Sequence, residues 1–122
     1  MSLADVQITL SQYALIARLS GEIDMSNAED MGATVVGATP NEVTGVVLDL
    51  SDVEYLDSAG IYVIFGMRAS LQARGQTLIM VIPPESPVHD ALRLSGAERL
   101  GEIAETVDEA VKTINRPSPA ET

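Results

Sequence analysis

The chain has 122 residues, 46% of them hydrophobic, which is enough for one domain with its own core and too few for two. It contains no cysteine, so disulfides, thiolate catalysis and zinc sites of the cysteine type are excluded. The net charge of −11 disfavours nucleic acid and anionic membranes as partners.

The first part of the chain predicts two strands and a helix. Val6–Leu10 predicts a weak edge strand, and Ala14–Ser20 alternates loosely between apolar and polar residues, as a strand does. After these, apolar residues recur at helical spacing. We therefore expect a helix that starts from a cap at Asp24 or Ser26 and ends at Thr39.

The middle of the chain predicts two buried strands separated by a long helix. Gly45–Leu50 is a short, almost wholly apolar run, which is typical of a strand buried on both faces. We expect a turn over Asp52–Gly60 and then a helix over Ile61–Arg74, whose apolar residues share a broad face. Gly75 is a natural helix stop, and Thr77–Ile82 predicts a further central strand.

Two more helices are expected near the C-terminus, a short one over Ser86–Leu94 and an amphipathic one over Glu105–Ile114. Strands that alternate with helices indicate an α/β fold, with a mixed, mostly parallel sheet of about four or five strands and about four helices. We expect one domain over residues 5–115 and a flexible tail over residues 116–122.

The most informative pattern is Asp57, Ser58, Ala59 and Gly60, between a buried strand and a helix. Loops of this kind form the working edge of a parallel sheet, and a helix N-terminus offers free N–H groups that can hold a phosphate. Ser58 supplies a hydroxyl, and Gly60 allows the backbone to approach closely. A serine or aspartate that only caps the helix explains the same residues, so both interpretations stay open.

Charge is distributed unevenly along the chain. The residues before Arg68 include ten acids and one base, a balance of −9, whereas the remainder has a balance of −2. The acids either keep a small protein soluble or prepare the N-terminal half for a basic protein partner.

Enzyme classes find little support in the sequence. The only histidine, His89, is not accompanied by a serine in a Gly-x-Ser-x-Gly context, and there is no P-loop, dinucleotide fingerprint or HExxH motif. We expect no catalytic residue and no metal ligand. The long helix is expected to bury most of its apolar residues in the core, with Met67 and Tyr62 as candidates for exposure on a partner face.

The stretch VVLDLSDVEYLDSAGIYVIFG, residues 46–66, resembles the centre of a STAS domain, the family of bacterial anti-sigma-factor antagonists. Three further features match: LSGEID at 19–24, the long helix closed by Gly75 with an apolar strand behind it, and LRLSGA at 92–97. The resemblance covers nearly all of the chain from Asp5 to Ile114.

The resemblance implies a cytoplasmic protein that binds an anti-sigma factor, itself a serine kinase of the GHKL type, and so frees a sigma factor. Ser58, directly after Asp57, would be the residue that this kinase phosphorylates, which would switch the antagonist off. A phosphatase of the PP2C type would reset it. ATP and Mg²⁺ would belong to the kinase, so the chain itself would be no enzyme and need no cofactor.

The same resemblance places Asp24 beside the acceptor loop, and we expect the partner to contact Asp24, Asp57, Ala59, Gly60 and Tyr62. For Asp24, a helix cap is an equally good interpretation. Ala59 stands where the family often has a second hydroxyl, and Tyr62 stands where it commonly has glycine. These departures keep a second hypothesis open, a STAS module that is not phosphorylated and serves as a scaffold or ligand-binding subunit in a transport or signalling assembly.

Overall fold

The computed structural model describes residues 5–94, 96 and 102–115, so the expected tail at 116–122 lies outside the described residues. Within this part the chain forms one sheet of five strands in the order β1-β2-β3-β4-β5. β1 is antiparallel to β2 and every other pairing is parallel, which confirms the α/β prediction. The strands are β1 (Asp5–Leu10), β2 (Ala14–Ile23), β3 (Gly45–Leu56), β4 (Thr77–Val81) and β5 (Glu102–Ala104), and the helices are α1 (Ala28–Ala38), α2 (Ser58–Ala73), α3 (His89–Leu94) and α5 (Val107–Asn115).

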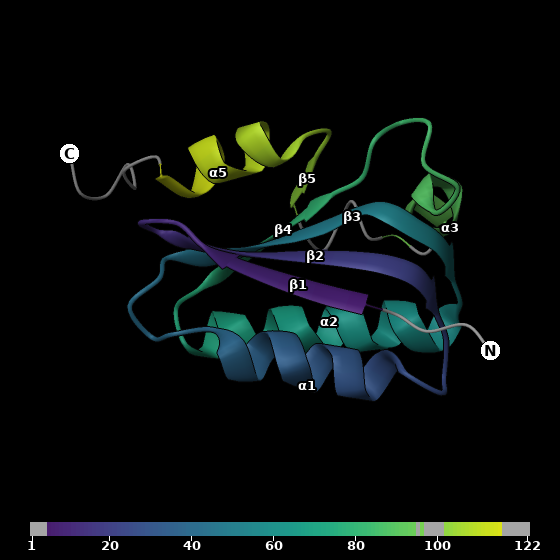
Figure 1. The fold of residues 1–122 in the computed structure, drawn as a ribbon, viewed down its shortest axis with the longest axis horizontal. Helices are drawn as coiled ribbons and strands as arrows, with labels where there is room; N and C mark the ends of the chain where they lie inside the picture. The colour runs from purple at the N-terminus through teal and green to yellow at the C-terminus, as the bar shows by residue number, and fades with distance from the viewer. Residues whose placement is uncertain (1–4, 95, 97–101, 116–122) are drawn as a thin grey trace.

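The sheet separates two layers of helices (Figure 1). α1 and α2 lie side by side across one face, and α5 covers part of the other face. β3 serves both layers: Val46, Leu48 and Leu50 belong to the core under α1 and α2, whereas Val47 packs with Ala110 and Ile114 of α5. Residues Gly45–Leu50 are all buried, as their apolar run predicts.

The predicted turn over Asp52–Gly60 is wrong, because β3 continues to Leu56. β2 also runs beyond its predicted end at Ser20, and the two strands pair from Ser20↔Asp52 to Ile23↔Leu56. A register shift next to Gly21, whose φ is 89°, lets β2 continue. β2 and β3 end opposite each other, at Ile23 and Leu56. α2 then begins at Ser58, three residues earlier than its apolar pattern predicts.

Other elements agree with the sequence in type and differ at their ends. α1 starts at Ala28 rather than near Asp24, and β5 was not predicted because three residues carry too little pattern. Gly75 has a φ of 74° directly after α2, which confirms its role as the helix stop. Of the two residues considered for exposure, Tyr62 is 79% exposed, but Met67 is only 3% exposed because it packs into the core.

No helix in the described ranges has both the length and the apolar character needed to span a bilayer.

Candidate functional site

The junction between β3 and α2 is held by Asp57, which is the N-cap of the helix. Its Oδ1 accepts a hydrogen bond from the Gly60 amide at 3.0 Å, and its backbone is extended. The Asp57 amide donates to the Ile23 carbonyl oxygen at 3.2 Å, so the junction is tied to the end of β2. The capping role that the sequence left open between serine and aspartate therefore belongs to Asp57.

Ser58 is the first residue of α2, and its side chain is exposed. Its hydroxyl makes no hydrogen bond to any described residue, because Asp57 already caps the helix. The amides of Ser58 and Ala59 likewise have no acceptor in the described part of the chain, as expected for a first helical turn. An accessible hydroxyl thus stands beside two free N–H groups at the positive end of the helix dipole.

Gly60 is required by close packing rather than by a turn. It lies within the helix and does not have a positive φ, so its backbone conformation does not call for glycine. A Cβ at this position would lie 2.5 Å from Cδ1 of Leu56 and 3.0 Å from Cγ2 of Ile23. The absent side chain lets the first turn of α2 sit directly on the ends of β2 and β3.

Asp24 shapes the connection between β2 and α1. Its Oδ1 accepts hydrogen bonds from the Ser26 hydroxyl and from the Ser26 amide at 2.9 Å, and its carbonyl accepts from the Ala28 amide at 2.9 Å. The two hydrogen bonds from Ser26 lower the pKa of Asp24, and the bond from the hydroxyl has the larger effect. Burial acts in the opposite direction. The prediction that Asp24 caps α1 is wrong, since the N-cap position is Asn27. The neighbour of Asp24, Ile23, is the residue hydrogen-bonded to Asp57.

A shallow hollow of about 450 Å³ lies against Ser58. It brings three of the predicted site residues together, Ser58, Ala59 and Tyr62, whereas Asp24, Asp57 and Gly60 do not line it. Its remaining wall comes from the start of α1 and the segment before it. The lining residues are Met25, Ala28, Glu29, Ser58, Ala59, Tyr62 and Val63.

Two exposed residues of this wall were missed by sequence reasoning. Met25 is 80% exposed beside the acceptor loop, and Glu29 is also exposed in the first turn of α1. Nothing in the spacing of the sequence connects residues 25–29 with residues 58–63, because only the parallel pairing of β2 with β3 brings them together. The one local signal is a large apolar side chain at Met25 outside any apolar stripe.

The lining of the hollow sets the chemistry that Ser58 can undergo. It includes no histidine, lysine or arginine, and its one acidic side chain is that of Glu29. His89 lies instead on α3, where its Nδ1 is 3.6 Å from Oδ1 of Asp90. In the residues that the structure describes, no group of three or more histidine or acidic side chains gathers as a metal site does.

Comparisons with known proteins give a family and a fold. A model of the STAS domain family matches residues 5–110. BtrV of Bordetella bronchiseptica, named as a candidate anti-sigma factor antagonist, is 27% identical over 106 residues, which cover 86% of this chain and 90% of BtrV.

Solved structures superpose over most of the chain. A candidate anti-sigma factor antagonist of Thermotoga maritima has a TM-score of 0.76 at 25% identity, with 91% of this chain and 95% of that chain covered. The antagonist SpoIIAA in its unphosphorylated form has a TM-score of 0.72 at 23% identity, with 90% and 96% covered. SpoIIAA of Bacillus has also been solved in a phosphorylated form, with a TM-score of 0.62 at 22% identity and 91% and 100% covered. The last two likenesses show a shared fold.

Proposed function

This chain belongs to the STAS domain family, and from that premise we propose that it is an anti-sigma-factor antagonist that phosphorylation of Ser58 switches off. The unmodified protein binds an anti-sigma factor and so releases a sigma factor. The observation that carries the proposal is the hydroxyl of Ser58 in the first turn of α2. It is exposed and makes no hydrogen bond to any residue that the structure describes.

The geometry explains how a single phosphate can act as a switch. Phosphoserine carries a charge of about −1.5 to −2 and three acceptor oxygens. At Ser58 these oxygens would meet two free amides of α2 while standing next to the carboxylates of Asp57 and Glu29. A partner that packs on the unmodified hollow would have to accommodate this excess negative charge out of water, which weakens binding without any change of fold.

The relatives support the proposal from a different side. Both BtrV and the Thermotoga maritima protein are named as candidate anti-sigma factor antagonists. SpoIIAA is an anti-sigma factor antagonist with separate unphosphorylated and phosphorylated structures. Antagonists of this kind are regulators, and the chain is accordingly a binding module and not an enzyme.

The proposal includes two partner proteins and a compartment. The anti-sigma factor is also a serine kinase of the GHKL type, which brings its own ATP and Mg²⁺, and a PP2C-type phosphatase removes the phosphate from Ser58. All act in the cytoplasm. Asp57 keeps the acceptor loop in place, and Ala59 and Tyr62 belong to the surface that the kinase contacts.

The test uses purified GHKL kinases from the same genome. With ATP, one of them should add the mass of one phosphate to the wild-type chain, and peptide mapping should locate it on Ser58. Binding to that kinase should persist in Ser58→Ala and weaken by at least about tenfold in Ser58→Asp.

Ser58→Asn is the matched control, because it has nearly the size of the aspartate variant and no charge. It should bind much more tightly than Ser58→Asp. Equal affinities for the asparagine and aspartate variants, or a phosphate on another residue, would show that Ser58 is not the switch. A chain that no kinase binds or modifies would point instead to the scaffold hypothesis.

A further inference from the structure

A second hollow of about 390 Å³ continues from the Ser58 hollow along the surface between α1 and α2. The two hollows share Glu29, Tyr62 and Val63, so they form one continuous depression. We call the second one the α1–α2 groove. It is lined by Glu29, Gly32, Ala33, Val36, Tyr62, Val63, Gly66, Met67 and Ser70.

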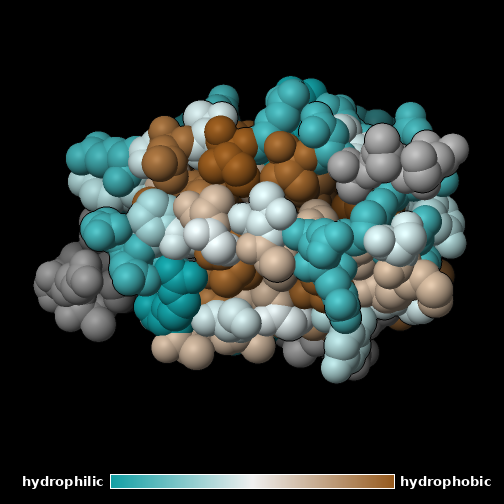
Figure 2. All heavy atoms as spheres, turned by 60° about the horizontal axis from the view of Figure 1, so that its bottom comes forward, coloured by the Kyte–Doolittle hydropathy of each residue, from teal (hydrophilic) through white to brown (hydrophobic). Residues whose placement is uncertain are grey.

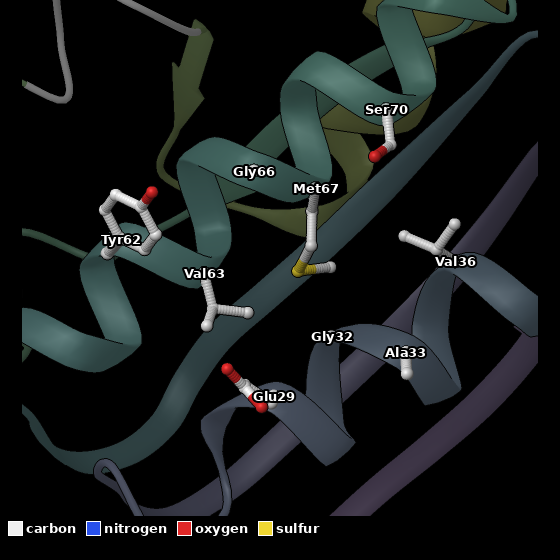
Figure 3. A pocket seen from close by; sticks show the side chains of 9 residues that line it. All are labelled: Glu29, Gly32, Ala33, Val36, Tyr62, Val63, Gly66, Met67 and Ser70. Atoms are coloured by element: carbon white, nitrogen blue, oxygen red, sulfur yellow. The ribbon is translucent and has the colours of Figure 1, made fainter.

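Figure 3 shows how the two helices build the α1–α2 groove. Val63 and Met67 point from α2 toward α1, and Val36 points from α1 toward α2, so the lining between the helices is apolar. The helices touch near Gly32, where a Cβ would lie only 2.6 Å from Cγ1 of Val63. Figure 2 turns the side of the molecule that carries α1 and α2 toward the viewer. Hydrophobic residues, in brown, lie there in depressions between paler and more hydrophilic residues.

Gly66 lies at a position where the described part of the chain does not require glycine. It lies in the middle of α2, where glycine weakens a helix. Its φ is not positive, and a Cβ placed on it would meet nothing within 4 Å. Neither the backbone nor the packing of this chain therefore requires glycine there. A bare backbone beside an apolar hollow is what the close approach of another molecule requires.

The lining of the α1–α2 groove carries very little charge. Although 20% of the chain is charged, Arg68 is the one charged residue of α2, and it is half-buried and does not line the groove. Glu29 is the single charged residue in the lining, and it forms no ion pair with any residue in the described ranges. An apolar lining with one unpaired carboxylate at its end is complementary to an apolar segment that carries one basic side chain.

We propose that the α1–α2 groove receives an amphipathic helix of the partner protein, with its apolar face over Val36, Val63 and Gly66 and a lysine or arginine against Glu29. This inference rests on the proposed function for the identity of the partner, which is the anti-sigma kinase. A helix lying in a groove between two helices is a common mode of protein recognition.

The proposal also links docking to Ser58. The basic side chain that reaches Glu29 enters the hollow that Ser58 lines. A phosphate on Ser58 would occupy this space, and one basic residue would leave most of the added negative charge unpaired beneath the partner. The kinase would then dock on the unmodified chain, and the phosphorylated chain would bind it weakly.

The first experiment measures binding of the kinase to variants of the full chain. Gly66→Leu adds a side chain whose Cβ meets nothing within 4 Å, at a position that lines the groove, and should weaken binding by about tenfold or more. Gly37→Leu is the matched control, because Gly37 is also a helical glycine with open space around it but does not line the groove. It should bind as the wild type does.

The second experiment needs no kinase. Two synthetic amphipathic helices of about 18 residues would share one leucine–alanine face and differ only in carrying lysine or glutamate at one end. In amide NMR spectra, the lysine peptide should shift Gly32, Ala33 and Gly66 more strongly than the glutamate peptide does. Glu29→Lys should reverse this preference, whereas Asp30→Lys, on the same exposed turn outside the groove, should not.

The two experiments separate the failure of each idea. If no kinase binds the wild-type chain but the lysine peptide occupies the groove, the proposed function fails and the docking site stands. If the kinase binds and Gly66→Leu leaves its affinity unchanged, or if the peptides shift amides elsewhere, the docking site is overturned while the role of Ser58 survives.

Discussion

Two neighbouring side chains at the start of α2 divide tasks that either could perform. Asp57 satisfies the Gly60 amide and so stabilises the helix end, which leaves the hydroxyl of Ser58 without a structural duty. A serine that capped the helix itself would lose that contact on phosphorylation and loosen the first turn. Because the aspartate takes the cap, the phosphate that we propose on Ser58 would not remove the hydrogen bond that caps α2.

A residue-scale prediction concerns Asp24, whose pKa lies below its usual value of 3.8 chiefly through the Ser26 hydroxyl. Ser26→Ala should raise the pKa of Asp24 toward 3.8, as measured by NMR titration of its carboxyl group, and Ser26→Thr should keep it low. Since the folded pKa lies below the unfolded one, this stabilisation is present above about pH 4 and is lost as pH falls through the folded pKa. A pKa unchanged in Ser26→Ala would contradict the assignment.

The two glycines of α2 give a matched pair of opposite sign. Gly60→Ala would place a methyl group 2.5 Å from Cδ1 of Leu56 and 3.0 Å from Cγ2 of Ile23, so it should lower the free energy of unfolding by about 1–3 kcal/mol. Gly66→Ala meets nothing within 4 Å and should raise it by about 0.5–1 kcal/mol through helix propensity. Urea unfolding measures both. The same sign for the two variants would refute the packing explanation of Gly60.

At the scale of the element, α2 depends on its cap. Asp57→Ala removes the acceptor of the Gly60 amide and should cost about 0.5–2 kcal/mol of the free energy of unfolding. Asp57→Asn keeps an acceptor oxygen and should cost much less. Chemical denaturation of both variants gives the comparison, and equal losses would indicate that the charge of Asp57 matters more than its hydrogen bond.

Which elements the sequence predicts correctly follows from where their signal resides. The buried run Gly45–Leu50 and the apolar face of α2 are local patterns, and both were identified. The extension of β3 to Leu56 depends on pairing with β2, and residues such as Glu54 and Tyr55 are exposed there. Exposed strand residues carry no apolar pattern, so a turn was predicted instead.

The candidate site shows the same division. Ser58 and its neighbours are contiguous in sequence, and a family motif is sufficient to find them. Met25 and Glu29 come from another segment, and the groove that joins them to Gly66 depends on how α1 packs against α2. Such a surface is a property of the tertiary structure, which one sequence alone does not reveal.

At the scale of the whole molecule, the sheet separates two sides. We call the face covered by α1 and α2 the working side, because it carries the groove, and the face covered by α5 the supporting side. α1 and α2 form the larger core with β2, β3 and β4 and also carry the groove, whereas α5 completes a smaller core behind the sheet. The segments on the working side come mainly from the acidic half of the chain, which has a balance of −9 before Arg68. A basic partner that docks in the groove would therefore lie against segments that come mainly from the acidic half of the chain.

This uneven charge predicts that salt changes stability and association in opposite directions. At a net charge of −11 the folded chain repels itself, and raising NaCl shortens the Debye length from about 30 Å at 0.01 M to about 8 Å at 0.15 M. The melting temperature should therefore rise over this range. The association rate with the basic partner should fall, because steering between opposite charges is screened by the same ions. Thermal melts and stopped-flow binding in one salt series test both, with sucrose in place of salt as a control that leaves charges unscreened. An association rate that is constant or rises with salt would mean that the acidic half of the chain serves solubility alone.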